Sequence, residues 1–130
     1  MTPFTSNMLV LNVLFFTHDA FVDPPAFKTR APDQVVLEGG PRINLTCTAD
    51  GEPTPSITWT KVFANGSDSN VLFTGEQFNL PNNRINDATY RCNASNGIGN
   101  DVNHTVNVVV ICEYVKYVHT LLRAVRGLLL

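Results

Sequence analysis

Apolar and polar residues alternate one by one along much of this chain, in short runs that end at Pro, Gly or Asn. This period of two is typical of a β-strand with one buried face, because successive side chains of a strand point to opposite sides of its sheet. Residues 42–50 show it clearly: Ile43, Leu45, Cys47 and Ala49 share one face, and polar residues lie between them. We therefore expect a half-buried strand at 42–50.

Similar runs follow at short intervals, and turns separate them. They are 56–62, with Ile57 and Trp59 in phase; 71–75; 76–80, with Phe78 and Leu80 inward; 88–95, with Tyr90, Cys92 and Ala94 together; and 101–111, with Val102, Val106, Val108 and Val110 in phase. Residues 24–41 are predicted to form one extended edge strand followed by a turn at 38–41. The prolines favour an edge, because proline has no amide hydrogen to donate to a neighbouring strand. Seven or so short strands of this kind predict an all-β fold, a β-sandwich.

Beyond residue 111 the period of two ends. In residues 112–130 the apolar residues recur at helical intervals, as Tyr114, Val118, Leu121, Leu122, Val125, Leu128 and Leu129. This spacing predicts an amphipathic helix, and Lys116, Arg123 and Arg126 argue against a membrane-spanning one. Two interpretations stay open: a basic helix that lies on a membrane or a partner, and a fragment end or translated non-coding stretch. Cys112 is then either an incidental free thiol or a residue that forms a disulfide with another chain.

Residues 1–23 form a separate region. The apolar run 7–16 has the length of a signal-peptide core, yet no Lys or Arg precedes it, and His18 lies where cleavage after Ala20 calls for a small residue. A signal peptide, the end of an upstream strand and a mis-joined start of a longer chain all stay open. The run is too short to span a membrane, which takes about 20 apolar residues.

Charge and composition narrow the function. Nine Lys plus Arg stand against eleven Asp plus Glu, a net charge of −2 without long blocks, so the chain offers no basic surface for nucleic acid. Charged residues make up 15% of the chain, below the roughly 25% of ordinary soluble domains. Solubility then depends on neutral polar groups or added sugars, which favours an extracellular protein, secreted or part of an ectodomain, over a cytosolic one.

The three cysteines form no C-x-x-C pair, and His18, His104 and His119 lack ligand spacing, so a four-ligand zinc site is not expected. One disulfide with one cysteine left over is the simplest account, and it implies an oxidising compartment. No catalytic triad, phosphate loop or metal motif stands out, and His104 fits a partly buried structural role. We expect no catalysis, metal, cofactor or small-molecule substrate.

Three linked patterns carry a family resemblance. They are Leu45-x-Cys47-x-Ala49-x-Gly51-x-Pro53, then Pro55-x-Ile57-x-Trp59-x-Lys61, and last Ala88-x-Tyr90-x-Cys92-x-Ala94-x-Asn96-x-x-Gly99. In this order and at these spacings, residues 24–111 resemble an immunoglobulin domain of the intermediate (I-set) type, with the constant-like C2 arrangement a close alternative. The resemblance implies a two-sheet Greek-key β-sandwich with one inter-sheet disulfide.

The resemblance also implies roles for the signature residues. Cys47 would bond Cys92 between the sheets, with Leu45 beside it in the core signature, Trp59 would pack on the disulfide, and the Tyr90 hydroxyl would tie the preceding turn to its strand. Gly97 and Gly99 would supply the positive φ of a hairpin. The chain departs from the family where Asp is usual and Asn86 stands, and where an apolar residue is usual and Asn83 stands.

Two functions follow from the resemblance. One is an extracellular recognition module of an adhesion protein or receptor that binds another protein, with Val62, Phe63 and Phe73 as candidate contacts. The other is a structural spacer in a tandem immunoglobulin array. Fold alone does not separate them, and a membrane link is expected only through a parent chain.

Four glycosylation acceptor triplets occur, at Asn44, Asn65, Asn93 and Asn103. Asn44, Asn93 and Asn103 alternate with inward residues, and Asn65 falls in a loop. All four are therefore expected to face solvent, as glycan attachment requires.

Overall fold

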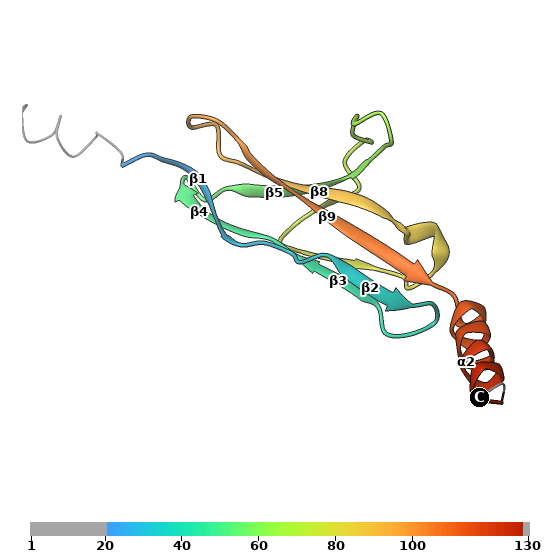
Figure 1. Ribbon diagram of the computed structural model, residues 1–130. Coiled ribbons are helices and arrows are strands. Elements are labelled where there is room, and N and C mark those ends of the chain that lie inside the picture. Colours follow the sequence, from blue (N-terminus) through green and yellow to red (C-terminus); the bar gives the residue numbers. More distant parts are fainter. Residues whose placement is uncertain (1–20, 129–130) are drawn as a thin grey trace, which may run out of the picture.

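The computed structural model describes residues 21–128, so the alternatives for residues 1–20 lie outside the described residues. Its strands form two layers around one core (Figure 1). One layer is a five-stranded sheet in the order β2 (Gln34–Leu37), β9 (Val102–Ile111), β8 (Ala88–Ser95), β5 (Ser56–Val62) and β6 (Phe73–Thr74). The predicted all-β sandwich is therefore confirmed.

The second layer consists of two antiparallel pairs. β1 (Asp23–Thr29) pairs with β4 (Thr48–Glu52), and β3 (Ile43–Thr46) pairs with β7 (Gln77–Leu80). Only Cys47 separates β3 from β4, and its amide donates to the Glu76 carbonyl at 3.0 Å. The predicted strand at 42–50 is thus interrupted only at the cysteine, and it ends at Glu52, two residues later than predicted.

The core is built from every second residue of the strands, as the alternation predicts. The buried side chains are Ala31, Ile43, Leu45, Cys47, Ile57, Trp59, Phe78, Leu80, Tyr90, Cys92, Ala94, Val106, Val108 and Val110. All of these except Ala31 lie on the face that the sequence pattern turned inward. Burial of this alternating set drives the two layers together, because apolar surface leaves water when they pack.

The expectation of one extended edge strand at 24–41 is wrong. β1 pairs antiparallel with β4 in one layer, whereas β2 pairs parallel with β9 in the other. The chain crosses between the layers at 30–33, where Ala31 is buried and Pro32 lacks an amide hydrogen to continue a ladder. Alternation shows which face of a strand is buried, but it does not show which sheet supplies its neighbour.

The hairpin between β8 and β9 depends on two glycines with positive φ, Gly97 at +76° and Gly99 at +62°. A Cβ on Gly99 would also lie 3.1 Å from the Cβ of Pro24, at the start of β1. Glycine at this position therefore permits both the turn and the close approach of β1.

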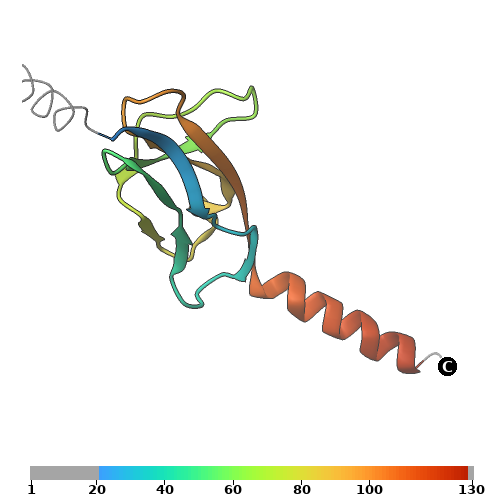
Figure 2. The same ribbon diagram turned by 90° about the vertical axis from the view of Figure 1, so that its left-hand side faces the viewer.

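The chain enters and leaves the sandwich at opposite ends. β1 begins at one end, and β9 leads at the other end into α2 (Glu113–Leu128), which projects away from the sandwich (Figure 1, Figure 2). Within residues 21–128, no helix has the length and apolar character to cross a membrane.

Candidate recognition surface

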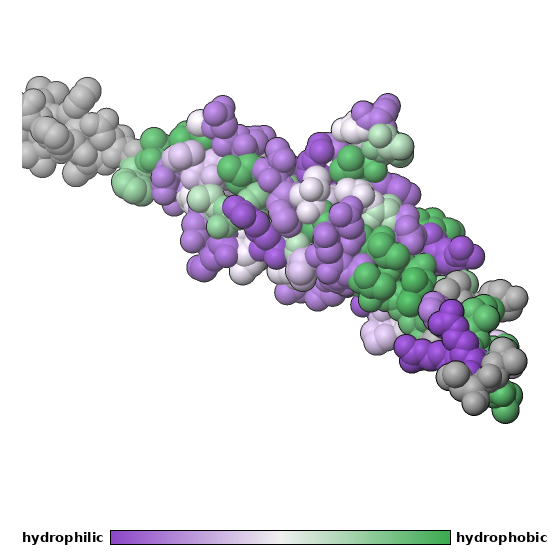
Figure 3. Space-filling view, viewed as in Figure 1, coloured by the Kyte–Doolittle hydropathy of each residue, from purple (hydrophilic) through white to green (hydrophobic). Residues whose placement is uncertain are grey.

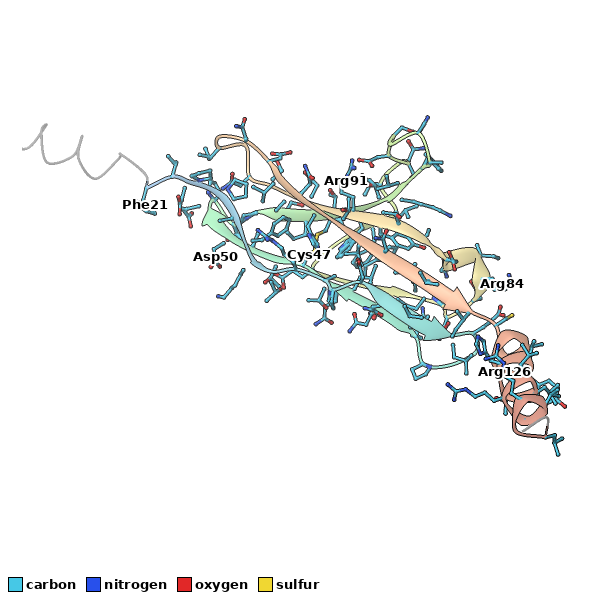
Figure 4. The ribbon with its side chains drawn as sticks, in the orientation of Figure 1. Phe21, Cys47, Asp50, Arg84, Arg91 and Arg126 are labelled. Carbon is cyan, nitrogen blue, oxygen red and sulfur yellow. A yellow bond between two sulfur atoms is a disulfide. The ribbon has the colours of Figure 1, made fainter. Side chains whose placement is uncertain are left out.

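The centre of the sandwich is a disulfide packed against aromatic rings. Cys47 and Cys92 are bonded across the two layers, with 6.6 Å between their Cα atoms, and both are fully buried (Figure 4). Trp59 is the direct neighbour of Cys92 on β5, and its indole nitrogen donates to the Gly75 carbonyl at 3.0 Å. The Phe78 ring lies 5.8 Å from the Trp59 ring. This cluster fixes the separation of the two layers on which the surface is built.

Tyr90 connects the core to the turn before β8. Its ring is buried, and its hydroxyl donates to the Asn86 carbonyl at 3.2 Å. Burial raises the pKa of the Tyr90 hydroxyl, and the nearby Asp87 carboxylate raises it further, because both disfavour the phenolate. The hydroxyl therefore has the position and the protonation state of a tyrosine corner.

The two departures from the family pattern flank this turn: Asn83 precedes the short 3₁₀ helix η1 (Arg84–Asn86), and Asn86 ends it. The Asn86 side chain donates to the Pro81 carbonyl at 2.7 Å and to the Asn83 side-chain oxygen at 3.2 Å. Asp87 accepts a hydrogen bond from the Val110 amide at 2.8 Å. Asparagine amides thus close a turn that the family usually closes with an aspartate, and Asp87 ties it to β9.

Asn96 holds three segments together at the end of the sandwich where β1 begins. Its Nδ2 donates to the Asp23 carbonyl at 2.7 Å and to the Pro53 carbonyl at 2.9 Å, and its Oδ1 accepts from the Ile98 amide at 3.0 Å. Gly51 makes room for it, since a Cβ there would lie 3.0 Å from that Nδ2. The sequence patterns included Asn96 but gave it no role.

Asn82 plays a similar part at the opposite end. Its Nδ2 donates to the carbonyls of Leu37 and Pro41, at 2.9 and 3.1 Å, and its backbone carbonyl accepts from the Gly39 amide. The partners are more than 40 residues away in the chain. No periodicity in the sequence indicates such a link.

His104 is a structural residue here. It is half-buried on the inner side of β9, its Nε2 lies 2.9 Å from the Ala31 carbonyl, and its ring meets the Phe27 ring edge to face at 6.4 Å. The contact holds the segment that crosses between the layers.

The glycosylation acceptors are distributed over both layers. Asn44, Asn65 and Asn103 are exposed, whereas Asn93 is only half-buried and donates to the Asp101 carboxylate at 3.1 Å. Hydrogen bonds from Ser95 and then Asn93 hold the pKa of the Asp101 carboxyl below its usual value. Asn93 also faces Asn103 directly across β8 and β9, so the outer face of the five-stranded sheet presents two acceptors side by side.

The candidate contacts lie at the β5–β6 edge. We use this name for the group of exposed apolar residues Phe63, Val71, Leu72 and Phe73 together with half-buried Val62. Phe63 is 50% exposed and Leu72 49%, whereas the Phe73 ring stacks on the buried Phe78 ring at 5.4 Å. The β5–β6 loop stands out from the sandwich and carries apolar atoms at its surface (Figure 3). Phe73 therefore anchors the edge to the core, while its neighbours face solvent.

A charged pair braces this loop. One terminal nitrogen of Arg91, on the outer face of β8, donates to both carboxylate oxygens of Asp68 at 2.8 Å. Both side chains are about one third exposed or less, at 27% and 33%, so water screens the pair only in part. The Ser69 hydroxyl adds a second tie, since it accepts a hydrogen bond from the Lys61 amide. Sequence reasoning missed both ties, because the partners lie in an irregular loop.

A second exposed apolar group lies on β2 and β9. Val35 and Val109 are paired in register and are 70% and 42% exposed, and Ile111 is 40% exposed. Figure 3 shows apolar atoms at this end of the sandwich, next to the start of α2. The outer sheet surface is therefore apolar near α2.

Comparisons with known proteins agree with this fold. The family model described as "Immunoglobulin domain" matches residues 24–96, and the chain belongs to this family. It is 38% identical over 88 residues to the mouse MAM domain-containing glycosylphosphatidylinositol anchor protein 2 and 31% identical over 116 residues to the Drosophila tyrosine-protein phosphatase Lar. These alignments cover 66% and 80% of the chain, but only 9% and 6% of the relatives.

Among solved structures, the chain is similar to a complex of Dpr2 Ig1–Ig2 with DIP-Theta Ig1–Ig3. The TM-score is 0.58 at 34% identity, over 68% of this chain and 32% of the other. The chain is thus an immunoglobulin domain that spans a small part of the length of its relatives.

Proposed function

We propose that this domain is an extracellular recognition module of a cell-adhesion or receptor protein, and that it binds another protein through the β5–β6 edge. One observation carries the proposal: a braced loop presents Phe63 and Leu72 to solvent, each about half exposed. Aromatic and aliphatic side chains on a rigid support are the usual centres of protein interfaces.

Other features support this choice of surface. Glycans on Asn44 and on the Asn93–Asn103 pair would shield both sheet faces, which leaves the edges and loops for contact. Asn65 lies in the β5–β6 loop itself, so binding through this edge requires that a glycan on Asn65 point away from Phe63 and Leu72. The internal disulfide fits an oxidising, extracellular compartment. The similar structure of Dpr2 with DIP-Theta is itself a complex of two immunoglobulin proteins, which makes such a protein a reasonable partner class. A net charge of −2 provides no attraction for nucleic acid.

The experiment is a binding screen with the chain secreted from animal cells. The chain, made multivalent, is tested against displayed ectodomains of immunoglobulin-family proteins and against itself. For any ligand found, the Phe63→Ser and Leu72→Ser variants should each weaken binding roughly tenfold, as expected for central interface residues. Ile85→Ser, which removes a 79% exposed apolar residue from η1 instead, should leave binding unchanged.

A structural spacer is the second candidate function. It is favoured by the entry and exit of the chain at opposite ends of the sandwich (Figure 1), the geometry that a linear array of domains requires. A spacer predicts no ligand in the screen. If a ligand is found and Ile85→Ser reduces its binding as much as Phe63→Ser does, the proposed edge is wrong.

A further inference from the structure

The helix α2 exposes a row of large apolar side chains. Tyr117 is 63% exposed, Leu121 46%, Leu122 54%, Val125 50% and Leu128 86%. The helix projects from the end of the sandwich (Figure 2), so no strand covers this row. The sequence and fold of the immunoglobulin domain give no reason for it.

Over residues 117–128 the helix is divided into two halves along its length. At about 100° per residue, seven residues fall within one half of the circumference: Tyr117, Val118, Leu121, Leu122, Ala124, Val125 and Leu128. The other half carries His119, Thr120, Arg123, Arg126 and Gly127. The boundary between the halves is therefore continuous, as it is in helices that lie at the surface of a bilayer.

The width of the apolar half argues against a second copy of the helix as its cover. A two-stranded coiled coil needs apolar residues at two positions of each heptad, here Val118 and Val125 with Leu121 and Leu128, and charged residues at the positions beside them. The flanking positions of α2 are Tyr117, Leu122 and Ala124, so a paired helix would leave them in water. A lipid surface covers the full half.

The charges of the helix also fit a lipid surface. His119, Arg123 and Arg126 line a shallow pocket together with Leu122. At about 100° per residue, Arg126 and His119 lie next to Leu122 at the border of the apolar half, whereas Arg123 lies in the middle of the polar half. Residues 117–128 contain no Asp or Glu. The arginines can stabilise the C-terminal end of the helix dipole, but that effect does not explain the apolar half next to them. Basic groups beside an apolar face match lipid phosphates beside acyl chains.

We propose that α2 binds the surface of a lipid bilayer that contains anionic lipid. It lies in the headgroup plane, with Leu121, Val125 and Leu128 toward the acyl chains and Arg126 beside the phosphates, while Arg123 on the polar half adds positive charge near the anionic surface. This second binding surface is separate from the β5–β6 edge, and neither depends on the other. Its effect would be to hold the domain against a membrane by the end at which β9 leaves the sandwich.

The test is sedimentation of the full chain with vesicles of phosphatidylcholine, alone or mixed with phosphatidylserine. We expect binding to the mixed vesicles that weakens as salt is added. The double variant Leu121→Gln, Val125→Gln should bind at least about tenfold more weakly. Arg123→Gln with Arg126→Gln should remove most of the preference for phosphatidylserine, again about tenfold. Ile85→Gln, an equally polar change on the sandwich, should have no effect.

Circular dichroism of each variant checks that the sandwich and the helix persist. Equal sedimentation of the Leu121→Gln, Val125→Gln variant and the wild type would overturn the proposal, and so would the absence of binding to both vesicle types. A wild-type oligomer that this variant disperses, without any vesicle binding, would show that a second copy covers the helix instead.

Discussion

Tyr90 shows how one hydroxyl connects the core to a turn. The Tyr90→Phe change removes the hydrogen bond to the Asn86 carbonyl, 3.2 Å long, and leaves the buried ring in place. We expect the fold to survive with a loss of about 1 kcal/mol in the free energy of unfolding, measured by chemical denaturation. Tyr117→Phe, on a 63% exposed residue, is the control and should not change the midpoint. Equal midpoints for both variants would show that the corner does not contribute.

The raised pKa of Tyr90 predicts a dependence on alkaline pH. The unfolded chain loses this proton near pH 10.0, whereas the folded chain keeps it to a higher pH. The folded state then binds more protons above pH 10.0, so its stability falls as pH rises further. Denaturation above pH 10.0 should show a shallower decline for Tyr90→Phe than for the wild type. Parallel declines would contradict the assigned shift.

Asn96 has a structural role that the sequence patterns did not indicate. Asn96→Ala removes three hydrogen bonds that join the start of β1, the β4–β5 turn and the β8–β9 hairpin. We expect a loss of about 2 kcal/mol in unfolding free energy, since each bond contributes about 0.5–1.5 kcal/mol. Asn100→Ala changes an exposed residue of the same hairpin and should stay within about 0.5 kcal/mol. Equal losses of unfolding free energy for the two changes would contradict the role assigned to Asn96.

At the scale of elements, the disulfide joins β8 to the chain between β3 and β4. Its ends are 45 residues apart, and the loop that it closes restricts the unfolded chain. Replacing both Cys47 and Cys92 by Ala should cost about 4 kcal/mol, measured by denaturation of secreted material. Cys112→Ser leaves the disulfide intact and should change stability little. A peptide map in which Cys112 is bonded to Cys47 or Cys92 would contradict this pairing.

The β5–β6 hairpin illustrates how elements position the recognition surface. Its strand β6 is only two residues long, so pairing with β5 alone gives the loop little rigidity. The stacking of Phe73 on Phe78, the Arg91–Asp68 pair and the hydrogen bond from the Lys61 amide to the Ser69 hydroxyl add support. Phe78 lies on β7 and Arg91 on β8. The position of the candidate surface therefore depends on strands outside its own hairpin.

At the scale of the whole molecule, glycans decide which surfaces stay open. We predict that at least two of Asn44, Asn65, Asn93 and Asn103 carry glycan when the protein is secreted from animal cells. Asn65 is the best placed, because it is exposed in a loop and its side-chain oxygen already accepts a 2.6 Å hydrogen bond from the Ser67 hydroxyl of its own triplet.

Peptide mass before and after glycosidase treatment measures the occupancy. Asn93 and Asn103 face each other across two strands, and their Cβ atoms are then about 5 Å apart. We therefore expect few molecules to carry glycan on both. A secreted chain without any glycan would show that the four acceptor triplets occur by chance.

The sequence by itself determined the inward faces of most strands and the core. Alternation turned Ile43, Leu45, Ile57 and Trp59 inward, and the buried set follows it. These features are local: the period of two depends only on the backbone of a single strand. The spacing around Cys92 likewise carried enough information to identify the family, because the disulfide, the tryptophan and the tyrosine occupy fixed places on adjacent strands.

The tertiary structure decided the rest. The sheet change between β1 and β2, the Asn82 and Asn96 contacts and the Arg91–Asp68 pair all join segments that are distant in sequence, up to 73 residues for Asn96 and Asp23. Polar side chains in turns have many available partners, and only the packing of the layers selects one. Periodicity shows which side chains are buried, but it does not show which distant residues they contact. The exposed residues of the candidate surface could therefore be predicted from the sequence, whereas the contacts that hold the β5–β6 loop in place could not.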